Sequence, residues 1–235
     1  MADSKPNGKQ SQPVQTEYYH DILASALAHD IVGPLGFAVQ IIRAMASGQP
    51  DEATLSALAQ CLEESHGKAE EILRLMRSKV TVDAGAEQAP LNLTDLTTHK
   101  IASLCPSFPA DFVWKGKGEV TAVSNAAAVS TAIENILTNA AKYSTDRQVQ
   151  LHCFEKNGMA MLEAENTTGE DAARIAEVLA ADQVPSSQER ACIGIYVSRS
   201  MVRMCGGDIT FEAPQSDRLR ATLSLPGKKQ PGRKG

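Results

Sequence analysis

The chain has 235 residues, 43% of them apolar and only 4% aromatic, with a formal net charge of −5; this suits one large or two small domains with aliphatic cores. The net negative charge does not indicate nucleic-acid binding. No apolar run approaches the roughly 20 residues of a membrane helix. The sequence also shows no positively charged and then apolar segment of the kind that directs secretion. Five scattered cysteines without metal-binding spacing predict reduced thiols in a cytoplasmic protein.

The first part of the chain predicts two long helices. Residues 1–15 are polar and are typical of a disordered tail. Apolar residues then recur every three or four positions over residues 16–46 and again over 52–82, which indicates two amphipathic helices joined by a tight turn. Because such a hairpin cannot bury both apolar stripes alone, we expect two chains to pair into a four-helix bundle. Packing against the chain's own second domain is the alternative.

The second part of the chain has a mixed pattern. Residues 84–90 are small and polar and indicate a linker. Behind it, alternating patterns predict strands, and helical periods predict helices. The predicted strands are 91–93, 112–114, 120–123, 148–155, 159–165, 208–213 and 219–225, and the predicted helices are 94–104, 125–143, 171–181 and 194–205.

The predicted fold class is therefore α+β, with a helical hairpin followed by an α/β sandwich. The predicted domain boundaries are a tail at 1–15, the hairpin at 16–83, a linker at 84–90, the α/β domain at 91–226 and a basic tail at 227–235.

His29 lies in the first predicted helix, off the apolar stripe and directly before Asp30. An exposed imidazole can attack phosphorus, and an adjacent carboxylate can hold the ring in the reactive tautomer. Pro34 should bend the helix about one turn later. A histidine on a helix is more often a solvated side chain, so this assignment depends on the rest of the chain.

A second constellation lies in the predicted helix at 125–143. Asn135, Asn139 and Lys142 follow one another at i, i+4 and i+7 and so share one side. Asparagine is a poor helix former, so two of them in mid-helix require a reason. An amide oxygen suits Mg²⁺ and a lysine suits phosphate, whereas a polar solvated face is the alternative.

Four segments in this order resemble the catalytic core of a bacterial sensor histidine kinase over about residues 17–226. Residues 28–35 (AHDIVGPL) resemble the H-box of the dimerisation and phosphotransfer domain. Residues 134–143 (ENILTNAAKY) resemble the N-box of the GHKL, or Bergerat-type, ATP-binding domain, residues 194–209 resemble its last glycine box, and residues 221–226 its closing strand. Agreement between independent signals makes the set far more specific than any one motif.

The resemblance implies a role for each matching residue. His29 would be phosphorylated, with Asp30 as its general base, and Glu134 would orient a water or the metal. Asn139 would bind Mg²⁺. The remaining nucleotide-binding candidates are Asn135 and Lys142 at the phosphates, Tyr143 beside the base, Asn166 in place of the adenine-reading aspartate, and Gly169, Arg190 and Gly194 in the glycine boxes.

The chain departs from the family at three places. The Asp-x-Gly-x-Gly box is not intact in residues 163–171, where Asn166 or Glu165 stands for the aspartate. Only Gly194 remains of the second glycine box, so the ATP lid is reduced and Arg190 is a substitute phosphate contact. Gly33, four residues after His29, has no side chain to orient a water, which predicts weak or absent phosphatase activity.

Three functions follow. The first is an ATP-dependent histidine kinase that uses ATP and Mg²⁺ and passes the phosphoryl group to an aspartate of a response-regulator receiver domain. It would form a homodimer and receive its input from a separate sensory protein. The second is an ATP-independent histidine phosphotransferase of a phosphorelay, of the ChpT kind. The third is a pseudokinase scaffold. We favour the first, because Mg²⁺ and triphosphate explain the polar side of the helix at 125–143.

Overall fold

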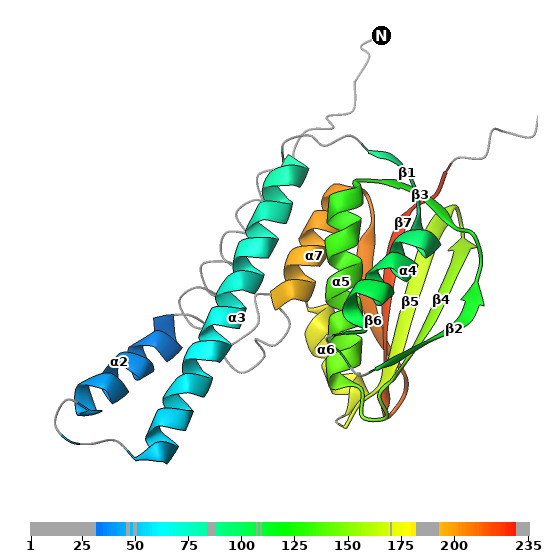
Figure 1. The fold of residues 1–235 in the computed structure, drawn as a ribbon. Helices are drawn as coiled ribbons and strands as arrows, with labels where there is room; N and C mark the ends of the chain where they lie inside the picture. The colour runs from blue at the N-terminus through cyan, green and yellow to red at the C-terminus, as the bar shows by residue number, and fades with distance from the viewer. Residues whose placement is uncertain are drawn as a thin grey trace, which may run out of the picture. The chain divides into compact units, whose positions relative to one another are not determined.

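The computed structural model of the chain describes residues 32–45, 48, 51–83, 88–106, 108, 110–169, 171–181 and 193–228. It divides into two compact units, Met1–Leu73 and Arg74–Gly235, and the boundary falls within a helix. The secondary structure is shown in Figure 1. Among the described helices, none is both long enough and apolar enough to cross a membrane.

The first unit contains α2 (Gly33–Met45) and most of α3 (Glu52–Asp83). Pro34 is the second residue of α2, in the first turn, where its missing N–H costs no helical hydrogen bond. The carboxylate of Asp51 accepts a hydrogen bond from the Thr54 amide at 2.8 Å and so caps the start of α3. The predicted helical residues 16–31, and the predicted bend after His29, lie outside the described residues.

The second unit is built on a five-stranded sheet in the order β2-β4-β5-β7-β6. Its strands are β2 (Asp111–Lys117), β4 (Gln148–Lys156), β5 (Met159–Thr167), β6 (Asp208–Gln215) and β7 (Arg218–Pro226). Only the β2–β4 pair is parallel; the other pairs are antiparallel. β1 (Ala89–Asn92) and β3 (Thr121–Ser124) form a separate antiparallel pair.

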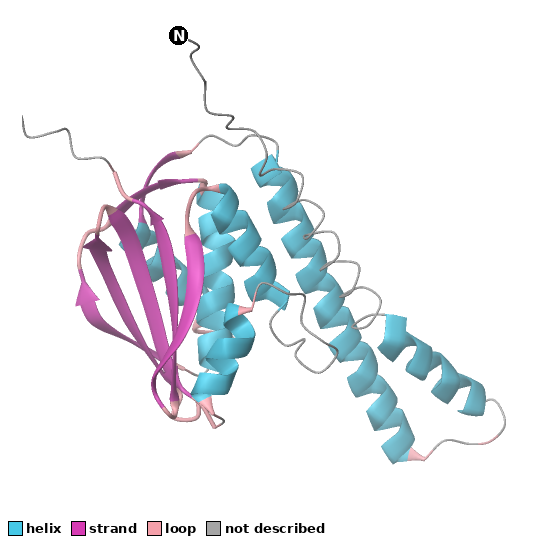
Figure 2. Cartoon of the chain, turned by 180° about the vertical axis from the view of Figure 1, so that it is seen from behind, coloured by secondary structure: helices cyan, strands magenta, loops and turns pink. Residues whose placement is uncertain are grey.

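Helices cover one face of this sheet (Figure 2). They are α4 (Leu93–Leu104), α5 (Ala126–Tyr143), α6 (Ala172–Ala180) and α7 (Ile193–Met204). The apolar face of α5, at Ile133, Ile136, Leu137 and Ala140, is buried in the core against the sheet. Burial of each isoleucine and leucine side chain contributes about 1.5–3 kcal/mol, so α5 is fixed against the sheet over most of its length.

The predicted elements correspond to observed ones, with shifts at their ends. The predicted helix at 125–143 includes Asn125, but this residue is the cap of α5, since its side chain accepts hydrogen bonds from the amides of Ala127 and Ala128 at 3.0 Å. Likewise β1 ends at Asn92, which caps α4 through a 3.1 Å bond from the Asp95 amide, so the predicted strand residue Leu93 is helical. The strand also begins at Ala89, inside the predicted linker.

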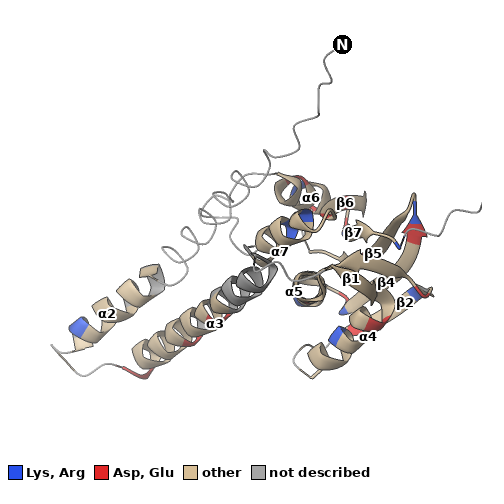
Figure 3. Ribbon diagram, turned by 90° about the horizontal axis from the view of Figure 1, so that it is seen from above, with Lys and Arg blue, Asp and Glu red and all other residues tan. Residues whose placement is uncertain are grey.

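Acidic and basic positions are interspersed along the described helices and strands (Figure 3). One cluster of ion pairs joins β5, β6 and β7, where Glu165 lies between Arg218 and Arg220, and Arg220 also contacts Glu212. This cluster ties three neighbouring strands together.

Candidate nucleotide-binding pocket

A pocket of about 1050 Å³ lies in the second unit, between α5, α6, α7 and the strands β5, β6 and β7. Much of its lining is apolar: Ile136, Ala140, Ala164, Ile175, Val178, Leu179, Ile195, Phe211, Leu219 and Ala221. Polar and amphipathic side chains occupy the remainder, namely Asn139, Tyr143, Asn166, Thr168, Asp171 and Arg174. An apolar cavity of this size with a few polar groups is typical of a small-molecule site.

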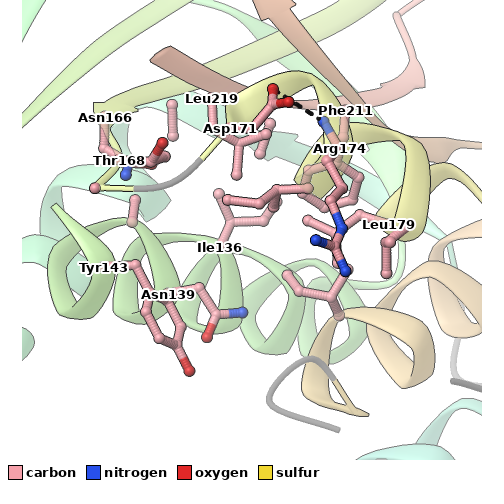
Figure 4. Close-up of a pocket in the computed structure, with 17 residues that line it drawn as sticks. Ile136, Asn139, Tyr143, Asn166, Thr168, Asp171, Arg174, Leu179, Phe211 and Leu219 are labelled. Atoms are coloured by element: carbon pink, nitrogen blue, oxygen red, sulfur yellow. Dashed lines mark hydrogen bonds between the residues drawn. The ribbon is translucent and has the colours of Figure 1, made fainter. Parts of the chain in front are cut away.

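α5 presents Asn139 and Tyr143 to the pocket (Figure 4). They are four residues apart, about one turn of the helix. Asn139 lies three residues after Ile136, and Tyr143 lies three residues after Ala140, so all four share one side of α5. Asn139 is half-buried and Tyr143 is 41% exposed. Two of the predicted nucleotide-binding residues are thus brought together at this wall.

The end of β5 supplies Asn166, which is 5% exposed. Its Nδ2 donates to the carbonyl of Thr167 at 2.9 Å. This bond orients the amide and leaves Oδ1 as an acceptor. Asn166 lines the pocket together with Gly169.

The rim beside Gly169 is held by hydrogen bonds. Thr145 Oγ1 contacts Thr167 Oγ1 at 3.0 Å, and the Thr168 amide donates to the carbonyl of Asp217 at 2.7 Å. A Cβ on Gly169 would lie 3.3 Å from Thr145 Cγ2, so the rim is closely packed there. Hydrogen bonds from the Gln148 amide and the Thr167 hydroxyl lower the pKa of the neighbouring Asp146, which keeps this carboxylate ionised.

α6 closes another side of the pocket. Asp171 caps this helix, since its Oδ1 accepts hydrogen bonds from the amides of Ala173 and Arg174 at 3.0 and 3.4 Å. Neither Asp171 nor Arg174 was predicted as a site residue. Asp171 stood at the predicted start of a helix, which is a capping signal, whereas nothing in the pattern around Arg174 pointed to the pocket.

Asn135 lies in a different environment from Asn139. It is 5% exposed, and its Nδ2 donates to the carbonyl of Gly194 at 3.0 Å and to Ser198 Oγ at 2.6 Å. Asn135 and the buried Gly194 therefore join α5 to α7, and neither is among the pocket-lining residues.

Glu134 and Lys142 also lie away from the pocket lining. Glu134 Oε2 accepts a 2.8 Å hydrogen bond from Lys100 Nζ of α4. Lys142 is exposed, with its Nζ 5.3 Å from the centre of the Tyr143 ring. The sequence-predicted residues His29, Asp30 and Arg190 lie outside the described residues.

Solved structures of histidine kinases have a similar fold. AdeS of Acinetobacter baumannii aligns with 83% of this chain and 96% of its own chain, at a TM-score of 0.56 and 12% identity. The ATP-binding domain of PrrB from Mycobacterium tuberculosis covers 61% of this chain and 99% of its own, at a TM-score of 0.50 and 19% identity. ShkA, solved with AMPPNP, aligns with 94% of this chain and 47% of its own, at a TM-score of 0.56 and 14% identity.

No protein-family model matches the chain, and no curated protein matches its sequence significantly. The α/β unit has the fold of histidine kinase catalytic domains, which confirms the α/β fold that the resemblance predicted for residues 91–226.

Proposed function

We propose that this chain is an ATP-dependent histidine kinase of a two-component system. The observation that carries this proposal is the convergence of Asn139, Tyr143 and Asn166 on one large pocket in a domain with the histidine kinase catalytic fold. Asn139 and Tyr143 come from the segment that resembles the N-box, and Asn166 stands in place of the aspartate in the box that is not intact.

The polar groups of the pocket fit an adenine nucleotide. Asn166 Oδ1 can accept a hydrogen bond from the amino group of the base, because its Nδ2 is already bonded to Thr167. Asn139 offers the hard oxygen that Mg²⁺ prefers. Within the described part of the chain no cluster of three acidic, histidine or cysteine residues could hold a metal, so Mg²⁺ would depend on the nucleotide's own phosphates for further ligands.

ATP bound with Mg²⁺ would supply the γ-phosphoryl group. An imidazole nitrogen of His29 forms the bond to phosphorus while the bond to the bridging oxygen breaks and ADP leaves. Asp30 holds the imidazole in the reactive tautomer and takes up its proton. The phosphoryl group then passes from His29 to an aspartate carboxylate of a response-regulator receiver domain.

The first unit supports a homodimer. Leu35, Val39 and Ile42 of α2 are between 43% and 51% exposed and lie at i, i+4 and i+7 on one face. Leu55 and Leu62 of α3 are 45% and 39% exposed. Apolar stripes of this kind are typical of helices that pack against a partner. We infer pairing of two hairpins into a four-helix bundle that also receives the receiver domain and a separate sensory protein.

A second candidate is an ATP-independent histidine phosphotransferase. Two N-box side chains that the family resemblance assigns to nucleotide chemistry are engaged elsewhere, Asn135 with α7 and Glu134 with Lys100. A domain that no longer uses ATP as a phosphoryl donor would tolerate such contacts. In that case His29 would accept its phosphoryl group from one receiver domain and donate it to another.

Incubation of the full chain with γ-labelled ATP and Mg²⁺ tests the proposal. The variants are His29→Ala, Asn139→Ala and, as a matched control, His99→Ala, which removes an exposed histidine of α4. A kinase would give acid-labile label in the wild type and the control and none in the other two variants.

Absence of label in the wild type would contradict the kinase. Offering the phosphorylated receiver of a response regulator would then separate the remaining functions. Transfer of the phosphoryl group from the receiver to His29 would support the phosphotransferase. If no transfer occurred, the pseudokinase scaffold would be the remaining function.

A further inference from the structure

The pocket contains one positively charged side chain among its described lining residues, Arg174 of α6. Arg174 is exposed, and its guanidinium makes no hydrogen bond or ion pair with another described residue. In Figure 4 the side chain extends away from Asp171 toward the side of the pocket where Asn139 lies. A guanidinium in this setting has all its donors available for a ligand.

The nearby acidic group does not neutralise this charge. Asp171 is three residues earlier, and it also lines the pocket. Its Oδ1 accepts from the backbone amides of Ala173 and Arg174, so the carboxylate is engaged in capping the helix. Among the residues that the structure describes, none gives the side chain of Arg174 an anionic partner.

α6 is firmly anchored, which fixes the position of Arg174 along the pocket wall. Tyr196 Oη donates to the carbonyl of Val178 at 2.9 Å. Arg199 Nη2 donates to the carbonyl of Leu179 at 2.5 Å, and Arg199 Nε donates to that of Ile209 at 2.8 Å. The last turn of α6 is therefore tied to both α7 and β6.

We propose that Arg174 binds the phosphate chain of the nucleotide in this pocket. The proposal rests on the proposed function, since it takes the ligand to be a nucleotide. A guanidinium can bind two phosphate oxygens at once. Lys142, the phosphate contact expected from the sequence, lies outside the pocket lining beside the ring of Tyr143. Arg174 therefore takes the place that the family resemblance gave to Lys142.

Isothermal titration calorimetry tests this assignment. Adenosine, AMP and ADP are each titrated into the full chain in the presence of Mg²⁺. Arg174→Gln removes the charge, and Arg174→Lys retains it. Lys156→Gln is the matched control, since it removes an exposed cation at the end of β4. Thermal unfolding of each variant shows that the fold is retained.

We expect Arg174→Gln to weaken ADP binding about tenfold, with adenosine changed less than about twofold, as for the loss of a hydrogen bond to a charged group. Arg174→Lys should restore part of the ADP affinity, and Lys156→Gln should bind all three probes like the wild type. Unchanged ADP affinity in Arg174→Gln, or equal losses for ADP and adenosine, would overturn the role of Arg174 alone. A wild-type chain that binds neither ADP nor adenosine would overturn the nucleotide site and this assignment with it.

Discussion

The side chain of Asn135 joins two helices that are far apart in the sequence, because its Nδ2 donates to Ser198 Oγ at 2.6 Å and to the carbonyl of Gly194 at 3.0 Å. All three residues are buried. Asn139, one turn later on α5, is half-buried in the pocket and makes no hydrogen bond with another described residue. The two asparagines of one motif therefore have different structural roles.

Asn135→Ala should lower the free energy of unfolding by about 1–3 kcal/mol, because it leaves a buried carbonyl and a buried hydroxyl without this donor. Asn139→Ala should change stability by less than about 0.5 kcal/mol and should instead weaken binding of Mg²⁺-nucleotide. Urea denaturation of both variants measures the difference. Equal destabilisation by the two substitutions would contradict these separate roles.

Glu165 should make the stability of the second unit depend on pH. Burial raises the pKa of this carboxyl, but hydrogen bonds and charges from Arg220 and Arg218 outweigh burial and hold the pKa below its ordinary value. A carboxyl group whose pKa is lower in the folded state than in the unfolded state stabilises the fold. This stabilisation is complete at pH values above the unfolded-state pKa of about 4.3, and it is lost as the pH falls through the folded-state pKa.

Glu165→Gln should therefore cost about 1–2 kcal/mol at neutral pH, and the difference from the wild type should shrink as the pH is lowered below about 4. Glu212→Gln is the control, because Glu212 contacts Arg220 but is 59% exposed, and surface pairs contribute at most about 1 kcal/mol. The free energy of unfolding of the wild type and of both variants, measured from neutral to acid pH, gives the pH dependence of each difference. A Glu165→Gln difference that does not change with pH would refute the assignment.

The cysteines should differ in reactivity. Burial raises the pKa of the Cys153 thiol to about 11, whereas Cys105 is exposed. Because the thiolate is the reactive form, Cys153 should resist alkylation near neutral pH while Cys105 reacts. Mass spectrometry of peptides after brief iodoacetamide treatment measures this, and treatment in denaturant should label both. Labelling of Cys153 at the rate of Cys105 in the folded protein would show that this core strand opens readily.

Elements with strong local signals could be predicted from the sequence. The turn at Asn157 and Gly158 has φ angles of 55° and 76°, as the Asn-Gly pair between two alternating strands indicates. The long apolar period of α5 likewise gave its end at Tyr143. The order of the motifs indicated the fold, because four local patterns in one sequence restrict the topology more than any one of them.

The contacts of individual polar residues could not be predicted in this way. Helical spacing puts Asn135, Asn139 and Lys142 on one side of α5, but what each meets depends on elements distant in the chain. Asn135 meets α7, Asn139 meets the pocket, and Lys142 stays exposed. Arg174 was overlooked because its importance comes from the approach of α6 to α5, which local periodicity does not encode.

Gly207→Ala should destabilise the second unit. A Cβ at Gly207 would overlap the carbonyl oxygen of Ser224 and lie 2.9 Å from Val202 Cγ1. Overpacking of this kind costs about 1–3 kcal/mol. Gly118→Ala is the control, because its Cβ would meet its nearest atom, the carbonyl oxygen of Cys153, at an ordinary 3.5 Å. Thermal unfolding of the two variants should separate them, and similar midpoints would contradict the close packing of Gly207 against β7.

The buried Arg199 should control the local stability of α6. It is 4% exposed, its Nη2 and Nε donate to the carbonyls of Leu179 and Ile209, and its guanidinium lies 5.5 Å from the centre of the Phe211 ring. Lysine carries the same charge but cannot donate in two fixed directions. Arg199→Lys should therefore release the last turn of α6 from β6 and leave α5 in place.

Amide hydrogen exchange of the full chain measures this effect by region. In Arg199→Lys, exchange should accelerate in α6 by about tenfold or more, as expected for the loss of a charged hydrogen bond, while the core amides of α5 and β5 change much less. Arg203→Lys, at a partly exposed arginine one turn later that pairs with Asp208, should leave α6 unaffected. Uniform acceleration across the whole unit would mean that Arg199 stabilises the fold as a whole, and no acceleration in α6 would mean that the bond to Leu179 does not hold the helix.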